Sequence, residues 1–138
     1  KPRSHLSPSD YARMSVEQLL LQDYQEFVKT IPTLDSSKKK VIVLFSGSKD
    51  VNGITWCTDC IAAEPIVTKV LQTEADDVLF VSVEVGDEKD FKMPSNPFRV
   101  HKNLNVKVVP TLLRWKTPHR LEELQCANED LVKMVFED

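Results

Sequence analysis

Trp56-Cys57-Thr58-Asp59-Cys60 is the segment around which the rest of this sequence is best interpreted. It places two thiols three positions apart, at the point where an apolar, strand-like run gives way to a helical pattern. Residues three apart on a helix surface are neighbours, so these two sulfurs can be bridged with little movement of the backbone. The segment therefore predicts a redox-active pair of cysteines.

The two cysteines are predicted to have different roles. Cys57, at or just before the first helical residue, would face unpaired backbone N–H groups and the positive end of the helix dipole, and both favour a thiolate. CxxC sites of this type lower the thiol pKa from about 8.5 to roughly 3.5–7.5. We therefore expect Cys57 to be the exposed nucleophile, and Cys60, one turn deeper, to be more buried and to act second.

A zinc site is one alternative for an isolated CxxC pair, but a structural zinc site needs four ligands, usually with a second closely spaced pair. The remaining candidate ligands are spread along the chain: Cys126, His5, His101 and His119. A purely structural disulfide is a weaker alternative, because closing so short a loop constrains the unfolded chain very little. A strand followed by CxxC and a helix favours the redox motif instead.

Three features resemble the thioredoxin fold: Trp56-Cys57-x-x-Cys60, then Pro65, and later Val109-Pro110-Thr111 before an apolar strand. Further segments resemble, more narrowly, the thioredoxin domain-containing protein 17 family: Phe45-Ser46-Gly47-Ser48-Lys49-Asp50, Asp59, Ala63-Glu64-Pro65 and Gly86 to Arg99. The resemblance covers nearly the whole chain, from Val16 to Asp138. It implies a three-layer α/β fold with a central mixed β-sheet flanked by helices. It also implies that Pro110 is a cis-proline facing the dithiol and that Trp56 supports the site.

Two positions depart from the patterns that the resemblance implies. The family commonly has Cys-Pro-Asp-Cys, whereas Thr58 stands in place of the proline, so Thr58 and Asp59 are candidates for tuning the redox potential. Ordinary thioredoxin carries a buried aspartate on the strand before the motif, where this chain has Leu44 and Phe45. Deprotonation of Cys60 would then be assisted by Asp59 or by a water molecule, or it would proceed without a dedicated base.

Length and composition predict one globular domain. The chain has 138 residues, of which 41% are hydrophobic and 28% are charged. We expect residues 1–13 to be an N-terminal tail or extension and residues 14–138 to be the thioredoxin-like domain. The net charge of −3 gives no argument for nucleic acid or an anionic membrane as partner. No apolar run approaches the roughly 18 residues of a membrane span.

Cysteine usage favours a reducing compartment. The count of three is odd, and two of the three stand in a reactive spacing, which is not typical of a secreted disulfide framework. We see no signal peptide with an apolar core near the N-terminus. We therefore expect a cytoplasmic protein.

Apolar periodicity predicts the order β-α-β-α-β-α-β-β-α. The expected strands are residues 16–21, 41–45, 78–85, 111–115 and 120–124, and the second of them should be buried on both faces. Asp23 should cap a first helix that Pro32 ends, and Asn128 should cap the last one. A short helix is expected at 98–104. Each of the longer helices is expected to turn one apolar face inward. These faces are Tyr24, Phe27, Val28 and Ile31 in the first helix, Ile61, Ala62, Ile66, Val67, Val70 and Leu71 in the helix after the motif, and Leu131, Val132, Val135 and Phe136 in the last.

Three features outside the motif have alternative interpretations. The loop at residues 46–55 should lie beside the dithiol, where Lys49 and Asp50 would be either local charges or solvated. The loop at residues 86–96 is a candidate for substrate discrimination, or a neutral excursion. Cys126 is interpreted as a bystander or a surface oxidation site, with a regulatory role as a third alternative.

The resulting hypothesis is thiol–disulfide oxidoreduction in the reducing direction, on protein or small-molecule disulfides, in support of cell redox homeostasis. The resemblance implies that thioredoxin reductase, using NADPH, restores the dithiol, and family members are also credited with weak peroxide removal and a role in cytokine signalling. We expect no bound cofactor or metal, and a monomer. The alternatives are a redox-sensing or signalling module with little turnover, and a secretory oxidase or isomerase, which usually carries a His where Thr58 and Asp59 stand.

Overall fold

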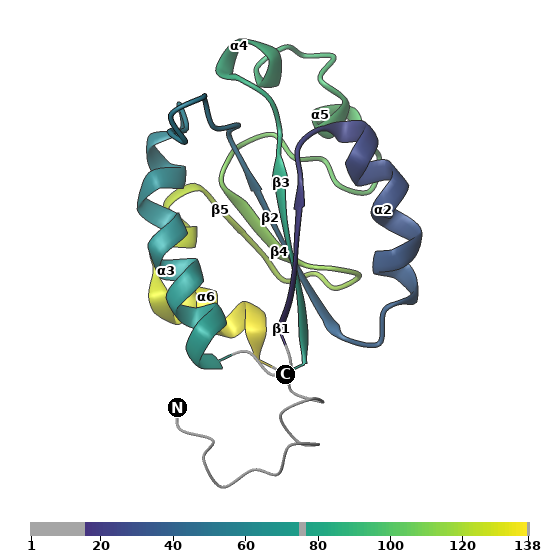
Figure 1. Cartoon of the computed structure of the whole chain (residues 1–138), viewed down its shortest axis with the longest axis vertical. Helices are drawn as coiled ribbons and strands as arrows, with labels where there is room; N and C mark the ends of the chain where they lie inside the picture. The colour runs from purple at the N-terminus through teal and green to yellow at the C-terminus, as the bar shows by residue number, and fades with distance from the viewer. Residues whose placement is uncertain (1–15, 75–76, 138) are drawn as a thin grey trace, which may run out of the picture.

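A five-stranded mixed β-sheet forms the centre of the molecule (Figure 1). The computed structural model describes residues 16–74 and 77–137, so the predicted tail at residues 1–13 lies outside the described residues. The strands lie in the order β1-β3-β2-β4-β5. Their bounds are β1 (Val16–Leu21), β2 (Lys40–Ser46), β3 (Val78–Glu84), β4 (Thr111–Arg114) and β5 (Arg120–Glu122). β1 and β2 run parallel to β3, whereas β4 is antiparallel to both β2 and β5.

Helices cover both faces of this sheet, which confirms the predicted three-layer α/β fold (Figure 1). The helices are α2 (Tyr24–Ser36), α3 (Thr58–Glu74), α4 (Glu88–Phe91), α5 (Pro97–Val100) and α6 (Glu129–Phe136), with a 3₁₀ helix η1 (Glu123–Ala127) before the last. The side chains of α3 and α6 pack on one face of the sheet, and those of α2 and α5 pack on the other.

Strand β2 shows why the sheet needs both layers. Its residues alternate between the two cores: Ile42 and Leu44 face α3 and α6, while Val43 and Phe45 face α2. All four are nearly inaccessible to solvent. The continuous apolar run is therefore the consequence of a strand covered on both faces, as the sequence predicted.

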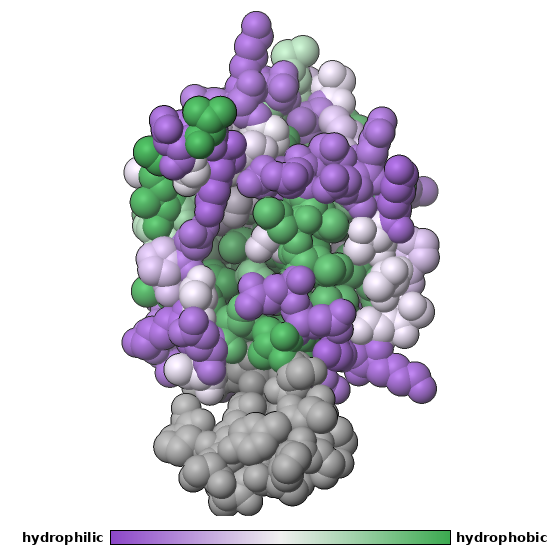
Figure 2. Space-filling view, viewed as in Figure 1, coloured by the Kyte–Doolittle hydropathy of each residue, from purple (hydrophilic) through white to green (hydrophobic). Residues whose placement is uncertain are grey.

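β1 is less completely covered than β2. Val16 and Leu20 are exposed. Figure 2 shows an apolar area on this side of the molecule, between α3 and α2. A cavity of ≈ 370 Å³ opens here between α3 and the strands β1 and β3, and it includes neither cysteine of the motif. No helix among the described residues is long and apolar enough to cross a membrane.

α2 is longer than predicted, and in both α2 and α3 some residues predicted to face inward are exposed. α2 continues through Pro32 to Ser36, so the prediction that Pro32 ends it is wrong. Pro32 is exposed, and the backbone group that its ring deprives of a partner can bind water there. Val28 is exposed as well. In α3 the inward residues include Ala63, Val67, Val70 and Leu71, whereas Ile61 and Ala62, predicted to be inward, are exposed.

Several short elements also differ. β5 ends at Glu122 rather than residue 124, because the chain turns into η1 through Glu123 with a φ of 55°. The helix expected at 98–104 is confined to α5, and α4 was not predicted at all. Both predicted caps are confirmed: Asp23 accepts a hydrogen bond from the Glu26 N–H, and Asn128 accepts one from the Leu131 N–H.

Candidate active site

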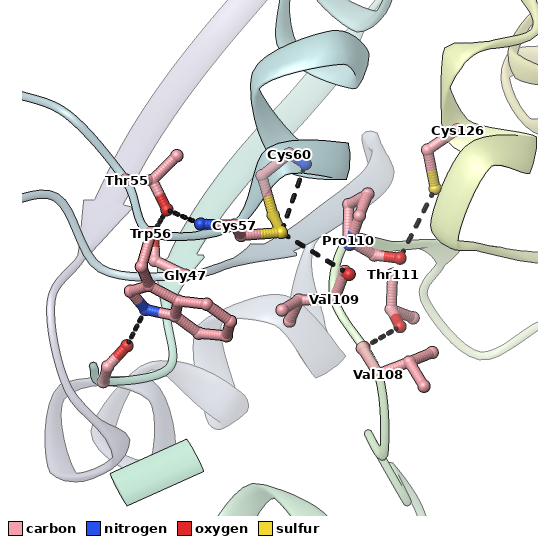
Figure 3. The surroundings of a disulfide bond; sticks show 11 residues. Gly47, Thr55, Trp56, Cys57, Cys60, Val108, Val109, Pro110, Thr111 and Cys126 are labelled. Carbon is pink, nitrogen blue, oxygen red and sulfur yellow. Dashed lines mark hydrogen bonds between the residues drawn. A yellow bond between two sulfur atoms is a disulfide. The ribbon is translucent and has the colours of Figure 1, made fainter. Parts of the chain in front are cut away.

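The two cysteines of the motif form a disulfide at the start of α3 (Figure 3). Cys57 comes directly before the helix, and its carbonyl oxygen accepts the first helical hydrogen bond, from the Ile61 N–H at 3.1 Å. Its Sγ lies 3.2 Å from the Cys60 backbone nitrogen, whose N–H it accepts. The sulfur of Cys57 therefore occupies the place of the oxygen in an ordinary helix N-cap.

This position favours negative charge on Cys57. The first N–H groups of a helix lack helical partners, and together with the helix dipole they stabilise an anion. In the dithiol state the Cys60 N–H would donate to a thiolate more strongly than to a neutral sulfur, because hydrogen bonds to charged acceptors are the stronger ones.

Both cysteines are buried in the disulfide state, at 5% exposure for Cys57 and 4% for Cys60. The prediction of an exposed Cys57 beside a buried Cys60 is therefore wrong for this state. The Val109 carbonyl oxygen lies 3.5 Å from Cys57 Sγ, so the segment before Pro110 covers the sulfur (Figure 3). Cys57 is reached through a groove that it lines together with Trp56 and Val109.

Pro110 follows a cis peptide bond, as the family resemblance implied. Its carbonyl oxygen accepts a hydrogen bond from the Glu123 N–H at 2.8 Å. The hydroxyl of Thr111, which is fully buried, donates to the Val108 carbonyl at 2.7 Å. The cis-proline segment, residues 104–110, is thus held at both Val108 and Pro110.

Trp56 connects the motif to two loops. Its indole Nε1 donates to the Gly86 carbonyl at 2.9 Å, and its ring lies 6.3 Å from the ring of Phe91 in α4. Gly47 packs against the same indole so closely that a Cβ atom there would lie 2.6 Å from Trp56 Cε2. Trp56 is therefore a fixed wall of the site.

The loop at residues 46–55 does lie beside the dithiol, but through Thr55 rather than its charged residues. The Thr55 hydroxyl donates to the Gly47 carbonyl at 2.9 Å and accepts from the Cys57 N–H at 3.2 Å. Lys49 pairs with Glu64 on α3 at 3.2 Å, and the Asp50 carboxylate accepts N–H groups within its own loop. The only signal for Thr55 in the sequence is its place directly before the motif.

No buried carboxylate stands near the dithiol among residues 16–74 and 77–137. Leu44 and Phe45 are buried where thioredoxin carries its aspartate, and the buried polar side chains in this part of the chain are Asn96 and Thr111. Asp59 is partly exposed and lines the groove next to Cys57. Cys60 is therefore deprotonated by Asp59, by water, or without a dedicated base.

A groove of ≈ 310 Å³ opens onto Cys57. It is bounded by the motif on one side and by α4, α5 and the cis-proline segment on the other. Both signs of charge are present. Its lining residues are Trp56, Cys57, Thr58, Asp59, Glu88, Phe91, Lys92, Arg99, Lys107, Val108, Val109 and Glu123.

Cys126 is completely buried in η1, so its interpretation as a surface oxidation site is wrong. Burial raises the pKa of its thiol to about 12. The thiol lies 3.7 Å from the Pro110 carbonyl oxygen, to which it can donate a weak hydrogen bond. Cys126 is thus a structural neighbour of the cis-proline.

The zinc alternative has no ligand set in the described part of the chain. No three His, Cys, Asp or Glu side chains lie together there as ligands of one ion would. His101 accepts a hydrogen bond from the Asn103 N–H, and His119 is exposed on the turn before β5.

A helix-capping CxxC disulfide, set against a cis-proline on a sheet of this strand order, is the arrangement of the thioredoxin-like proteins. Comparison with known sequences narrows this class. The profile of the family "Thioredoxin domain-containing protein 17-like, thioredoxin domain" matches residues 20–138, and the chain belongs to that family.

Individual relatives agree with this assignment. The chain is 37% identical to human (Homo sapiens) Thioredoxin domain-containing protein 17 over 122 residues, which cover 88% of this chain and 96% of the human protein. It is 39% identical to the Danio rerio protein of the same name, over 87% of this chain and 94% of that protein. Thioredoxin-like protein Clot of Arabidopsis thaliana is 33% identical over 66% of this chain and 72% of its own length.

Proposed function

We propose that this protein is a thiol–disulfide oxidoreductase that reduces disulfides in proteins or small molecules. The observation that best supports this proposal is the place of Cys57 Sγ, which caps α3 through the Cys60 N–H and borders an open groove. A sulfur so placed is stabilised as a thiolate, and the thiolate is the form that attacks disulfides.

The reaction consists of two exchanges. The Cys57 thiolate attacks one sulfur of the substrate disulfide, and the other substrate sulfur leaves as a thiolate and takes up a proton. Cys60, after losing its proton, then attacks Cys57 Sγ and releases the second substrate thiol. Two electrons have passed from the dithiol to the substrate, and the protein is left with the Cys57–Cys60 disulfide.

The remaining assignments complete the proposal. Thioredoxin reductase would return two electrons from NADPH to the disulfide, in the cytoplasm. Thr58 and Asp59 would tune the redox potential, and the wall of the groove formed by Phe91, Lys92 and Arg99 would discriminate between substrates. Loops beside a rigid site commonly have this role.

A coupled assay tests the activity. Consumption of NADPH is followed with thioredoxin reductase and a panel of protein and small-molecule disulfides, with wild type beside Cys57→Ser. We expect turnover by the wild type only. Absence of turnover by the wild type with every disulfide would favour the alternative, a redox-sensing or signalling module.

The roles of the two thiols are tested by trapping. Cys60→Ser should lose turnover yet accumulate a mixed disulfide through Cys57, because no second sulfur is close enough to release the substrate. Cys57→Ser should lose turnover and form no covalent complex. Non-reducing gels distinguish these outcomes, and a complex formed by Cys57→Ser but not by Cys60→Ser would reverse the assignment.

A further inference from the structure

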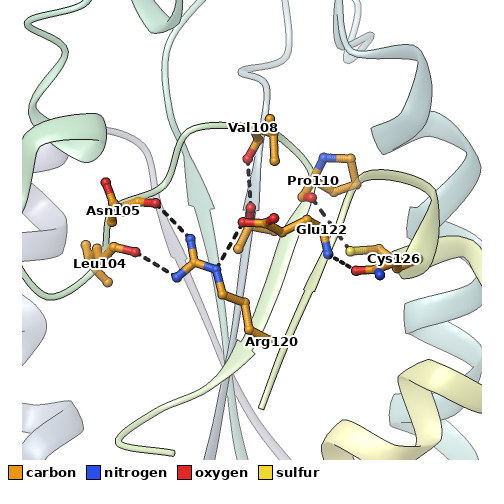
Figure 4. Close-up of polar contacts among 9 residues, drawn as sticks. Leu104, Asn105, Val108, Pro110, Arg120, Glu122 and Cys126 are labelled. Atoms are coloured by element: carbon orange, nitrogen blue, oxygen red, sulfur yellow. Dashed lines mark hydrogen bonds and ion pairs between the residues drawn. The ribbon is translucent and has the colours of Figure 1, made fainter. Parts of the chain in front are cut away.

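The guanidinium of Arg120 binds two main-chain carbonyls at the start of the cis-proline segment (Figure 4). Arg120 lies on β5. Its Nη1 donates to the Leu104 carbonyl at 2.7 Å and its Nη2 donates to the Asn105 carbonyl at 2.9 Å. Such charge-assisted, paired hydrogen bonds fix direction as well as distance. Asn105 has a φ of 49°, a left-handed conformation, so the guanidinium holds a turn that the chain seldom adopts.

Glu122 orients this guanidinium and also begins η1. Its carboxylate lies 3.2 Å from Arg120 Nε, and its own N–H donates to the Gln125 side chain at 2.9 Å. As a partly exposed ion pair this contact adds little to stability by itself. Its consequence is geometric, because it leaves Nη1 and Nη2 directed at the two carbonyls.

The same stretch of chain holds the other end of the cis-proline segment. The Glu123 N–H and the Cys126 thiol both point at the Pro110 carbonyl. Figure 4 shows the contact of Cys126. Residues 104–110 are therefore anchored at one end by Arg120 and at the other by η1.

The anchored segment forms one side of the site. Lys107, Val108 and Val109 line the groove, and the Val109 carbonyl oxygen is 3.5 Å from Cys57 Sγ. A carbonyl oxygen at this distance accepts the proton of a thiol and repels a thiolate. It also keeps water from the sulfur. Both effects favour the thiol over the thiolate, so the position of Val109 influences the reactivity of Cys57.

We propose that Arg120 is a positioning residue for the dithiol. Through the Leu104 and Asn105 carbonyls, it holds the cis-proline segment against Cys57 and so fixes both the shape of the groove and the reactivity of the nucleophile. Arg120 does not touch the sulfurs or the groove. This inference rests on the proposed function only where turnover is concerned, since the reactivity of Cys57 can be measured without it.

The test compares Arg120→Gln and Arg120→Lys with wild type by two measurements. The first is the pH midpoint of Cys57 alkylation by iodoacetamide in the reduced protein. Arg120→Gln should lower it by about half a pH unit, within the range of about one unit by which protein surroundings shift side-chain pKa values. The second is kcat/KM for a protein disulfide, which should fall about tenfold, mainly through KM, since a misplacement of about 1 Å can cost about 100-fold. Arg120→Lys should lie between, because a single ammonium cannot reproduce the planar fork.

Arg114→Gln is the matched control. Arg114 Nη1 also donates to a main-chain carbonyl, that of Glu137 at 2.7 Å, at a place outside the groove and the cis-proline segment. It should leave both measurements unchanged even if it lowers the melting temperature. An unchanged midpoint and kcat/KM in folded Arg120→Gln would overturn the proposal, and so would an equal change in Arg114→Gln.

The role of Arg120 can still be tested if Arg120→Gln does not fold or if the wild type reduces no disulfide. If Arg120→Gln does not fold, Arg120→Lys and Glu122→Gln provide the same measurements, and Glu122→Gln should give a smaller change in the same direction. If the wild type reduces no disulfide, the proposed function fails, while the alkylation midpoint still decides the role of Arg120.

Discussion

At the scale of the residue, adding a single methyl group at Gly47 should reduce both stability and turnover. A Cβ atom there would lie 2.6 Å from Trp56 Cε2 and 2.8 Å from the Thr55 hydroxyl oxygen. The indole cannot easily move away, because Gly86 and Phe91 hold it. We expect Gly47→Ala to lower the free energy of unfolding by about 1–3 kcal/mol, as overpacking does, and to lower turnover as Trp56 and Cys57 shift.

Gly53→Ala separates these two effects. Nothing lies within 4 Å of a Cβ atom at Gly53, but its φ of +77° disfavours a side chain. Urea unfolding should therefore show a loss of stability with unchanged turnover. A Gly47→Ala protein as active as Gly53→Ala would show that the contact with Trp56 has no effect on the site.

Thr58 is the first residue of α3, and this position suits the proline that the family commonly carries. The N–H of a first helical residue has no partner in the helix, and the fixed φ of proline is that of a helix. The preceding N-cap residue is ordinarily extended, which is also the conformation that proline requires before it. We expect Thr58→Pro to stabilise the protein by about 0.4–1 kcal/mol.

The same substitution should change the reduction potential by tens of millivolts at most, because about 30 mV already corresponds to about 1.4 kcal/mol for two electrons. Equilibration with glutathione measures the potential, with Thr58→Ala as control. A potential that stays unchanged in Thr58→Pro would mean that Thr58 is not a tuning residue.

Cys126 should be inert near neutral pH and should matter at alkaline pH. Its pKa of about 12 in the folded protein is above the ordinary value of 9.0, because burial disfavours the thiolate. The thiol therefore contributes stability that is fully present below pH 9 and is lost as the pH rises towards 12. Mass mapping should find Cys126 unmodified by iodoacetamide in the folded protein.

Between pH 8 and pH 11 the wild type should lose on the order of 2 kcal/mol more than Cys126→Ala does. Denaturant unfolding across that range gives the difference. Parallel curves for the two proteins would show that Cys126 does not titrate differently in the folded and unfolded states.

At the scale of the element, ion pairs of Glu129 connect α6 to α3. The Glu129 carboxylate lies 2.8 Å from Lys69 Nζ on α3 and 3.3 Å from Lys133 Nζ one turn along α6. The hydrogen bond from Lys69, and then that from Lys133, lower the pKa of Glu129. Glu129 therefore contributes stability above its ordinary pKa of 4.5, and this contribution is lost as the pH falls through the lowered value.

Glu129→Gln should be less stable than wild type at pH 7 and approach it at pH 3. Urea midpoints over that range measure the effect, and Asp130→Asn, an exposed neighbour in the same turn, is the control. A difference between Glu129→Gln and wild type that does not change with pH would exclude the ion pairs as its source.

Local signals predicted the elements better than they predicted the directions in which side chains point. The caps at Asp23 and Asn128, the strand at β2 and the CxxC pair follow from residues a few positions apart, and all four are confirmed. On α3, Val67, Val70 and Leu71 face the core as predicted, whereas Ile61 and Ala62 do not. Ala63 faces the core instead, because it stands four residues before Val67 and so shares its face of the helix.

The parts of the site that the sequence could not supply come from long-range contacts. The burial of Cys126, the cover of Cys57 by Val109, and the contact of Arg120 with Leu104 each join segments distant in the chain. No periodicity or local motif contains such a contact. The cis state of Pro110 was predicted only through the family resemblance, since proline alone gives a prior of about 5%.

At the scale of the whole molecule, the site lies where the parallel strands β2 and β3 end. The chain leaving β2 supplies Gly47, Thr55 and the cysteines, and the chain leaving β3 supplies Gly86 and Phe91. This is the edge at which ligands usually meet parallel sheets. β4 is antiparallel to β2, so it begins where β2 ends, and the cis-proline segment that precedes β4 lies at the same end of the sheet (Figure 1).

The strand order has a consequence for synthesis on the ribosome. β1 leaves the exit tunnel first, yet its partner in the sheet is β3, and β2 and α3 must emerge before β3 does. β2, α3 and β3 form a contiguous βαβ unit that can assemble from its own residues. The earliest-made strand therefore waits, with its apolar residues Leu19 and Leu21 uncovered, for a later-made neighbour. During that interval the nascent chain presents an unpaired apolar segment, which is the kind of surface that chaperones bind.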